Sequence, residues 1–138
     1  MGTDASLAAY LTAQSGKRFE LGVHDCLTFT NGWWQVRCDA GFADEVIGKY
    51  QGLGQKAAAK LMWEAFNTTD LQKALDDRLQ RVNFPARGDI VISKLAKPYF
   101  TGYAMGICSG VTSVFLGDHD MIHLATDQID GAWTCRSY

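Results

Sequence analysis

Apolar residues recur at helical spacing through the first half of the chain and at strand spacing through the second. In the first half, spacings of three and four residues predict four helices, at about 4–14, 26–38, 55–66 and 70–79. After Pro85 the apolar residues alternate or run continuously, which predicts five strands, at 89–93, 102–108, 112–116, 121–125 and 132–136. Helices followed by strands indicate an α+β fold, with N-terminal helices packed on a C-terminal antiparallel sheet or half-barrel.

The predicted helices begin at polar residues suited to capping. Thr3 or Asp4 caps the first helix, and Asp25 suits the N-cap of the second because its carboxylate accepts a hydrogen bond from an early helical N–H. Residues 69–72 read Thr-Asp-Leu-Gln and fit a capping box at the start of the fourth helix. The second helix carries an apolar stripe at helical spacing, formed by Cys26, Phe29, Trp33 and Val36. The thiol of Cys26 is therefore expected to face the body of the protein.

Length and composition predict a single domain over residues 1–138. With 47% hydrophobic residues the chain is long enough for one substantial core and too short for two ordinary domains. The net charge of -2 includes no run of Lys or Arg, so nucleic acid is not an expected partner. No apolar segment approaches the roughly 20 residues that span a bilayer, and no basic N-terminal stretch leads into an apolar run. We expect a soluble chain made in the cytosol, with no membrane span.

The cysteines do not indicate a metal site. Cys26, Cys38, Cys108 and Cys135 lie far apart, with no Cys-x-x-Cys pair, so neither a structural zinc ion nor another cofactor is expected. Disulfides are not expected in a reducing compartment. Cys38, Cys108 and Cys135 are therefore interpreted as small buried apolar residues.

Cys26 is the candidate nucleophile. It stands at the start of a predicted helix, where unpaired backbone N–H groups favour an anion such as a thiolate. The negative charge of Asp25 opposes thiolate formation. A cysteine nucleophile also needs a base, usually His, and a third group that orients the base. The alternative interpretation is a buried thiol retained for packing.

The chain has only three histidines that could serve as this base. His24 is interpreted as a loop residue that hydrogen-bonds locally, because neighbours at a helix start rarely face each other. His119, between two aspartates, is interpreted as solvated. His123, on a predicted strand, is the best remaining base. The alternative for His123 is a half-buried strand residue with one ring nitrogen satisfied.

The order of these motifs resembles the NlpC-type branch of papain-like cysteine peptidases, which cut peptidoglycan stem peptides and also occur in phage tail tips. Asp25-Cys26 matches the Asp-Cys that opens the family's first helix, and Gly88-Asp89 matches its turn into the first strand. The family's next strand reads His-x-Gly-Ile and carries the general base, whereas residues 104–107 read Ala-Met-Gly-Ile. The resemblance implies that Ala104 replaces the base. It also implies that His123, in a Met-Ile-His-Leu segment, stands at the third catalytic position, although the spacing is several residues longer.

The chain is also similar to a divergent group of small phage proteins. That group has a His-Asp-Cys opening, a Gly-x-Tyr segment, a Gly-Asp strand, a Gly-Ile/Val-x-x-Gly strand and a final Ala-Trp. This chain has the same order, with the second, fourth and fifth motifs at 48–50, 106–110 and 132–133. The resemblance spans roughly residues 18–136 and rests on the order of the motifs, because each one alone is common.

Aromatic residues supply candidate contact points for other proteins. Adjacent residues on a helix point about 100° apart, so one of Trp33 and Trp34 is expected in the core and the other, Trp34, at a partner or rim contact. Tyr99 and Phe100 follow Pro98 in a loop between two predicted strands, where exposed aromatic residues favour binding.

Two functions are expected from these observations. The preferred one is a structural component of a phage tail tip or hub, with a degenerate catalytic set. It is located in the virion, assembled in the host cytoplasm and bound to other tail proteins. The alternative is an active cysteine hydrolase that cleaves peptidoglycan stem peptides, with Cys26 attacking and His123 or another residue taking the proton. The first is preferred because loss of a general base removes about 10² to 10⁴ in rate, which a thiol of pKa about 8.5 does not recover.

Overall fold

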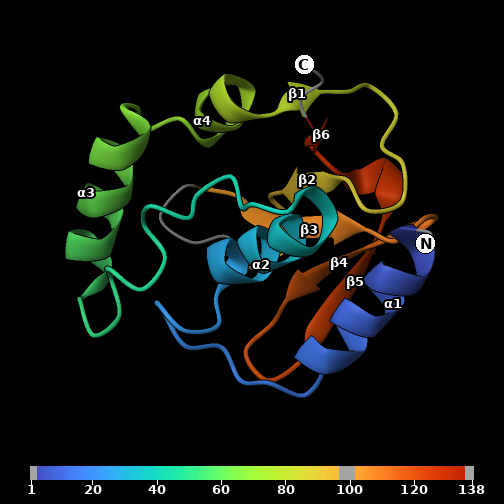
Figure 1. Ribbon diagram of the computed structural model, residues 1–138, viewed down its shortest axis with the longest axis horizontal. Helices are drawn as coiled ribbons and strands as arrows, with labels where there is room; N and C mark the ends of the chain where they lie inside the picture. Colours follow the sequence, from blue (N-terminus) through green and yellow to red (C-terminus); the bar gives the residue numbers. More distant parts are fainter. Residues whose placement is uncertain (1–2, 97–101, 136–138) are drawn as a thin grey trace.

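The computed structural model describes residues 3–96 and 102–135. The expected contact residues Tyr99 and Phe100 lie outside the described residues. Figure 1 shows the helices α1 (Thr3–Gln14), α2 (Cys26–Cys38), α3 (Gln55–Phe66) and α4 (Leu71–Arg78). It also shows the strands β1 (Gln80–Arg81), β2 (Ile90–Ser93), β3 (Ala104–Cys108), β4 (Thr112–Leu116), β5 (Met121–Ala125) and β6 (Gly131–Thr134). A short 3₁₀ helix, Thr126–Gln128, precedes β6.

The structure is α+β, as the hydrophobic pattern predicts. Each predicted helix and strand is present, with ends that differ by at most two residues, and α2, α3, β4 and β5 match their predicted bounds. The sequence pattern missed β1 and the 3₁₀ helix, which are too short to show a periodicity. The predicted capping box at 69–72 is wrong, because Asp70 is the N-cap of α4 and accepts from the Gln72 N–H.

The described strands form one antiparallel sheet in the order β1-β6-β2-β3-β4-β5. Consecutive hairpins join β2, β3, β4 and β5. The last strand, β6, returns to lie between β1 and β2 and pairs Ala132 with Val91. The chain therefore returns after β5, and its last strand pairs with the first two strands, β1 and β2.

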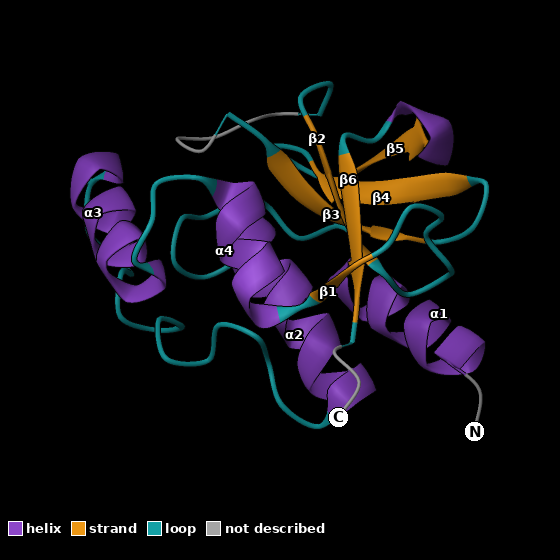
Figure 2. Ribbon diagram, turned by 90° about the horizontal axis from the view of Figure 1, so that it is seen from above, coloured by secondary structure: helices purple, strands orange, loops and turns teal. Residues whose placement is uncertain are grey.

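Each face of the sheet carries its own apolar cluster. The larger cluster joins α1, α2, α3 and α4 to one face of the sheet, through residues such as Ile90, Met105 and Ile107. The smaller cluster lies on the opposite face and includes Val91, Ala104 and Cys108. Because side chains alternate along a strand, neighbouring residues of β3 belong to different clusters. In Figure 2 the helices α1, α2 and α4 lie along one side of the strands.

Helix α2 is the central helix, and its buried surface extends beyond the apolar stripe that the sequence predicts. Phe29 and Trp33 are buried as expected, whereas Val36 is 51% exposed. Trp34 is also buried, at 3% exposure, and packs edge-on against Phe42. The expectation that Trp34 contacts a partner is therefore wrong. The segment that follows α2 folds back and covers this side of the helix, so both tryptophans belong to the core.

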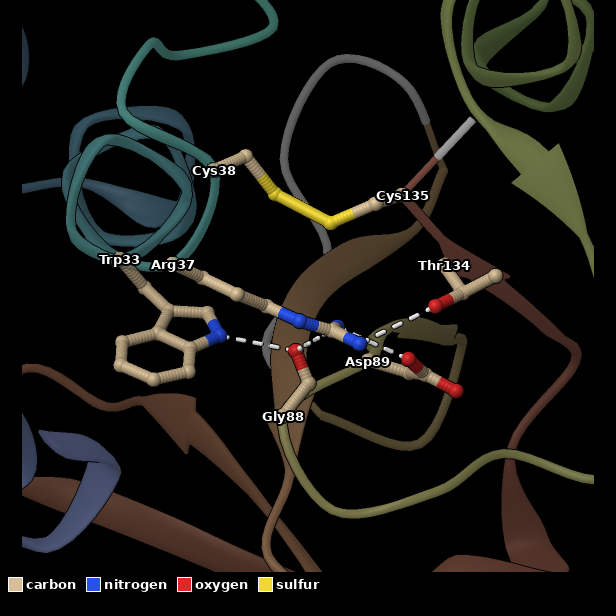
Figure 3. The surroundings of a disulfide bond; sticks show 7 residues. All are labelled: Trp33, Arg37, Cys38, Gly88, Asp89, Thr134 and Cys135. Atoms are coloured by element: carbon tan, nitrogen blue, oxygen red, sulfur yellow. Dashed lines mark hydrogen bonds and ion pairs between the residues drawn. A yellow bond between two sulfur atoms is a disulfide. The ribbon is translucent and has the colours of Figure 1, made fainter. Parts of the chain in front are cut away.

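A disulfide joins Cys38, the last residue of α2, to Cys135, just after β6 (Figure 3). The interpretation of these two residues as unpaired apolar residues is wrong. They are 97 positions apart, and the return of β6 to its place between β1 and β2 brings them together. Cys108 is a free and fully buried thiol, as expected.

Polar contacts tie the same two elements together beside the disulfide (Figure 3). The Arg37 guanidinium donates to Asp89 Oδ1 at 2.9 Å, to the Gly88 carbonyl at 2.7 Å and to Thr134 Oγ1 at 3.1 Å. The Trp33 indole N–H donates to the same Gly88 carbonyl at 2.8 Å. The C-terminal end of α2 is thereby fixed to the start of β2 and the end of β6.

Within the described residues, the helices are all too short or too polar to cross a membrane.

Candidate functional site

The N-terminus of α2 is capped by the Asp25 carboxylate, both of whose oxygens accept hydrogen bonds. Asp25 is the N-cap, and its Oδ1 accepts from the Thr28 N–H at 2.9 Å, while Thr28 Oγ1 accepts from the Asp25 N–H at 2.8 Å. Asp25 Oδ2 accepts from the Gly22 N–H at 2.8 Å. The Tyr50 hydroxyl approaches both carboxylate oxygens, at 2.8 and 3.0 Å. Asp25 is 3% exposed, so these donors replace the water that it loses on burial.

Tyr50 is a site residue whose role the sequence does not show. It is fully buried, and its hydroxyl donates a hydrogen bond to the Asp25 carboxylate. Burial raises the pKa of Tyr50, and the Asp25 carboxylate raises it further. The sequence does contain a hint of this role, because the Gly48-Lys49-Tyr50 segment is one of the ordered motifs. The motif does not show that Tyr50 contacts Asp25. Tyr50 and Asp25 together make the start of α2 a rigid structural junction.

The Cys26 thiol lies next to this junction as the first residue of α2. Burial of the thiol raises its pKa to about 12, and the charge of Asp25 adds to the rise. Backbone hydrogen bonds from Met105, Cys26 and Leu27 partly oppose it. At this pKa the thiol is mostly protonated at pH 7. The helix start alone therefore does not activate Cys26, because burial outweighs it.

An apolar pocket opens beside the thiol. Its walls come from the segment before α2, the start of α2, helix α3, helix α4 and β3, and the apolar side chains that line it are Phe19, Leu21, Leu27, Met62, Trp63, Phe66, Leu71, Ala74 and Met105. Polar residues Thr68, Thr69 and Asp70, in the turn between α3 and α4, line it as well. A second, smaller pocket shares Leu27, Phe66, Leu71, Ala74 and Met105. Such a lining suits an apolar group and offers no described cationic side chain.

None of the three histidines reaches this pocket. His123 is exposed on β5, and β4 separates it from β3. Adjacent strands lie about 4.8 Å apart, so the backbone of His123 lies about 10 Å from the β3 strand that contacts Cys26. His119 is exposed in the turn between β4 and β5. The structure does not bring the candidate pair Cys26 and His123 together.

His24 is the histidine nearest to Cys26 in sequence, and it is 7% exposed. Its backbone forms an isolated bridge with Glu20, but its ring Nε2 is buried without a hydrogen-bond partner. Burial lowers the pKa of His24, Lys17 lowers it further, and Asp25 opposes the change. The backbone of His24 therefore forms the expected local hydrogen bonds with Glu20, whereas its ring Nε2 does not form one.

The strand position facing the thiol is Met105, not Ala104. Met105 lines the pocket with Cys26 and belongs to the helix-side cluster. Ala104 belongs to the cluster on the opposite face of the sheet, where it is paired with Ser93. The motif comparison placed the lost base at Ala104, but a side chain there points away from Cys26. The sequence does not single out Met105, because the face of the sheet to which a side chain points depends on the register of the strand, and the motif does not reveal that register.

No cluster of three His, Cys, Asp or Glu side chains that could hold a metal ion occurs among the described residues. The site therefore consists of an unactivated thiol, a saturated carboxylate and an apolar pocket. This set can bind an apolar group, and no histidine lines the pocket beside the sulfur.

A family model matches nearly the whole chain. The family model described as a domain of unknown function, DUF6950, matches residues 2–135. Neither the curated proteins nor the solved structures include a match. Since the family model covers nearly the whole chain, the chain belongs to the DUF6950 family of domains of unknown function.

Proposed function

We propose that this chain is a non-enzymatic structural component of a phage tail tip or hub, built on a papain-like scaffold whose catalytic set is degenerate. The observation that carries the proposal is the environment of Cys26. Burial raises the pKa of its thiol to about 12, and the histidines lie outside its pocket. A general base contributes about 10² to 10⁴ in rate, so a thiol without one is a poor peptidase nucleophile.

The arrangement of elements supports the papain-like part of the proposal. A cysteine begins the central helix, and that helix packs against an antiparallel sheet formed by the second half of the chain. The motif order of the sequence supports the phage part. Other tail proteins are then the partners, and the apolar pocket beside Cys26 is a place where an apolar side chain of a neighbour inserts.

The disulfide supports a place in a particle that works outside the cell. Disulfides persist in oxidising surroundings and are rare in the cytosol. A virion protein is synthesised in the host cytoplasm and later leaves it, so the proposal implies that the link between Cys38 and Cys135 forms after release. The disulfide thus supports the proposed place of the mature chain in the virion.

Two measurements test the proposal. Purified chain is incubated with peptidoglycan sacculi, with Cys26→Ala as the matched control. We expect the two proteins to release the same background of soluble stem-peptide fragments. In parallel, particles of a phage that encodes the chain are purified and analysed by mass spectrometry, with host cytosolic proteins as the contamination standard. We expect the chain in the particles at a fixed ratio to the tail proteins.

The alternative function is a cysteine hydrolase acting on peptidoglycan stem peptides. It is favoured by the place of Cys26 at the N-terminus of α2, where unpaired backbone N–H groups beside the thiol are suited to stabilise an oxyanion. Fragment release that requires Cys26 would establish this alternative and refute the non-enzymatic proposal. Absence of the chain from purified particles would refute the placement in the virion.

A further inference from the structure

Strand β5 is an edge of the sheet whose outer side has no partner among the described residues. The hydrogen bonds at its two ends fix which residues face outward. Gly117 N–H donates to the Asp120 carbonyl, and Thr126 N–H donates to the Val111 carbonyl. In an antiparallel pair the hydrogen-bonded residues alternate, so Ile122 and Leu124 bond to β4. The backbone groups of Met121, His123 and Ala125 therefore point away from the sheet.

The outward groups of His123 and Ala125 are available for pairing. The Met121 N–H is held by the Asp120 side chain at 2.8 Å, while no backbone hydrogen bond of the described chain uses the N–H or carbonyl of His123 or Ala125. His123, at the centre of the strand, is exposed. The four other residues of β5 are apolar and half-buried, and no lysine or proline protects the strand. Unprotected apolar edges of this kind are templates for another strand.

We propose that β5 pairs antiparallel with β5 of a second copy of this chain, about a two-fold axis at His123. The pairing continues the sheet across two molecules. Under this symmetry His123 faces His123 of the second copy, Met121 faces Ala125, and Ile122 faces Leu124. Each apolar residue of one strand is thus matched with an apolar residue of the other, on both faces of the joined sheet.

The sequence of β5 favours a second copy over an unrelated strand. The central residue is the only polar one, and the apolar residues are placed symmetrically around it. An isologous two-fold contact requires this self-complementarity. A strand of five residues buries little surface, so the dimer is weak and forms at high local concentration. The proposal concerns a surface remote from Cys26 and is independent of the proposed function.

The test measures self-association of the full chain by sedimentation equilibrium up to about 1 mM, which reveals dissociation constants in the millimolar range. We expect a dimer of twice the 15.2 kDa chain mass. His123→Pro removes the outward N–H, which an edge strand tolerates, and is expected to weaken the dimer at least about tenfold. His123→Ala keeps the N–H and is expected to dimerise within about threefold of wild type. Thermal unfolding of both variants checks that they are folded.

Amide exchange gives a second readout that does not rely on a variant. At low concentration the amides of His123 and Ala125 exchange fast, while those of Ile122 and Leu124 are protected by β4. At high concentration all four are protected. A chain that stays monomeric at every concentration overturns the proposal. So does a dimer in which His123→Pro associates like wild type, because the contact then lies elsewhere.

Discussion

At the scale of single residues, the facing of one strand decides the chemistry near Cys26. Met105 and Ala104 are adjacent, yet one lines the pocket and the other packs on the opposite face of the sheet. The motif suggests that histidine was lost at Ala104, whereas the structure indicates Met105 as the position from which a side chain reaches the sulfur. This difference can be tested by placing histidine at each position.

Met105→His is expected to activate the thiol. An imidazolium beside Cys26 stabilises the thiolate, so the rate of Cys26 alkylation at pH 7.4 rises at least about tenfold. Ala104→His is the matched control and leaves that rate within about twofold, because its ring lies across the sheet. The rates are measured by mass spectrometry of the modified peptide in protein shown to be folded. A larger rise for Ala104→His than for Met105→His would contradict the assigned facing.

The buried Tyr50 is expected to stabilise the charge of Asp25. Tyr50→Phe removes a hydroxyl donated to a buried carboxylate, and we expect the free energy of unfolding to fall by about 1.5 to 3 kcal/mol. Tyr10→Phe is the control, because the Tyr10 hydroxyl donates to the neutral Phe29 carbonyl and its loss costs about 1 kcal/mol. Both values come from urea denaturation. If both variants lose the same free energy of unfolding, the hydrogen bond from Tyr50 to the charged Asp25 is no stronger than one to a neutral carbonyl.

The raised pKa of the half-buried Cys26 thiol also predicts a dependence of stability on pH. The folded-state pKa of Cys26 is raised to about 12, above the value of about 8.5 for an unfolded chain. The folded state therefore holds a proton that the unfolded state releases, and stability falls by up to about 1.4 kcal/mol per pH unit above pH 9. Cys26→Ala should lose this part of the slope between pH 9 and 10.5. Identical slopes for the two proteins would mean that folding does not raise the pKa of the Cys26 thiol.

At the scale of elements, the local signals in the sequence were sufficient for the helices and the long strands. The spacing of apolar residues located α2 and α3 to the residue, and Asp25 is the N-cap that its chemistry predicts. What the sequence could not reveal depends on contacts between distant segments. The burial of Trp34, the disulfide of Cys38 and the facing of Met105 all follow from topology and register.

The disulfide is expected to stabilise the junction of α2 and β6. It closes a loop between residues 97 positions apart, and its reduction should lower the free energy of unfolding by about 2 to 4 kcal/mol. The fold should survive, because Arg37 and Trp33 hold the same junction without it. Urea denaturation with and without a reductant measures the change. The double variant Cys38→Ser, Cys135→Ser is the control and should not respond to reductant. A wild-type midpoint that is unchanged by reductant would contradict the link.

At the scale of the whole molecule, the central helix is fixed at both ends. Asp25 and Tyr50 hold its start, and the disulfide with Arg37 holds its end. The helix positions Cys26 at an apolar pocket, yet the histidines lie outside that pocket. The molecule is therefore organised as a scaffold with an apolar pocket and with a strand edge, β5, that is unpaired among the described residues, and no histidine lines the pocket beside the thiol.

The rate of Cys26 alkylation as a function of pH, measured in the intact folded chain, tests this account most directly. We predict a rate at pH 7.4 at least about tenfold below that of free cysteine, rising through pH 10 without a plateau, because the thiol stays protonated over this range. A plateau reached below pH 7, as a thiolate paired with an imidazolium produces, would contradict the account.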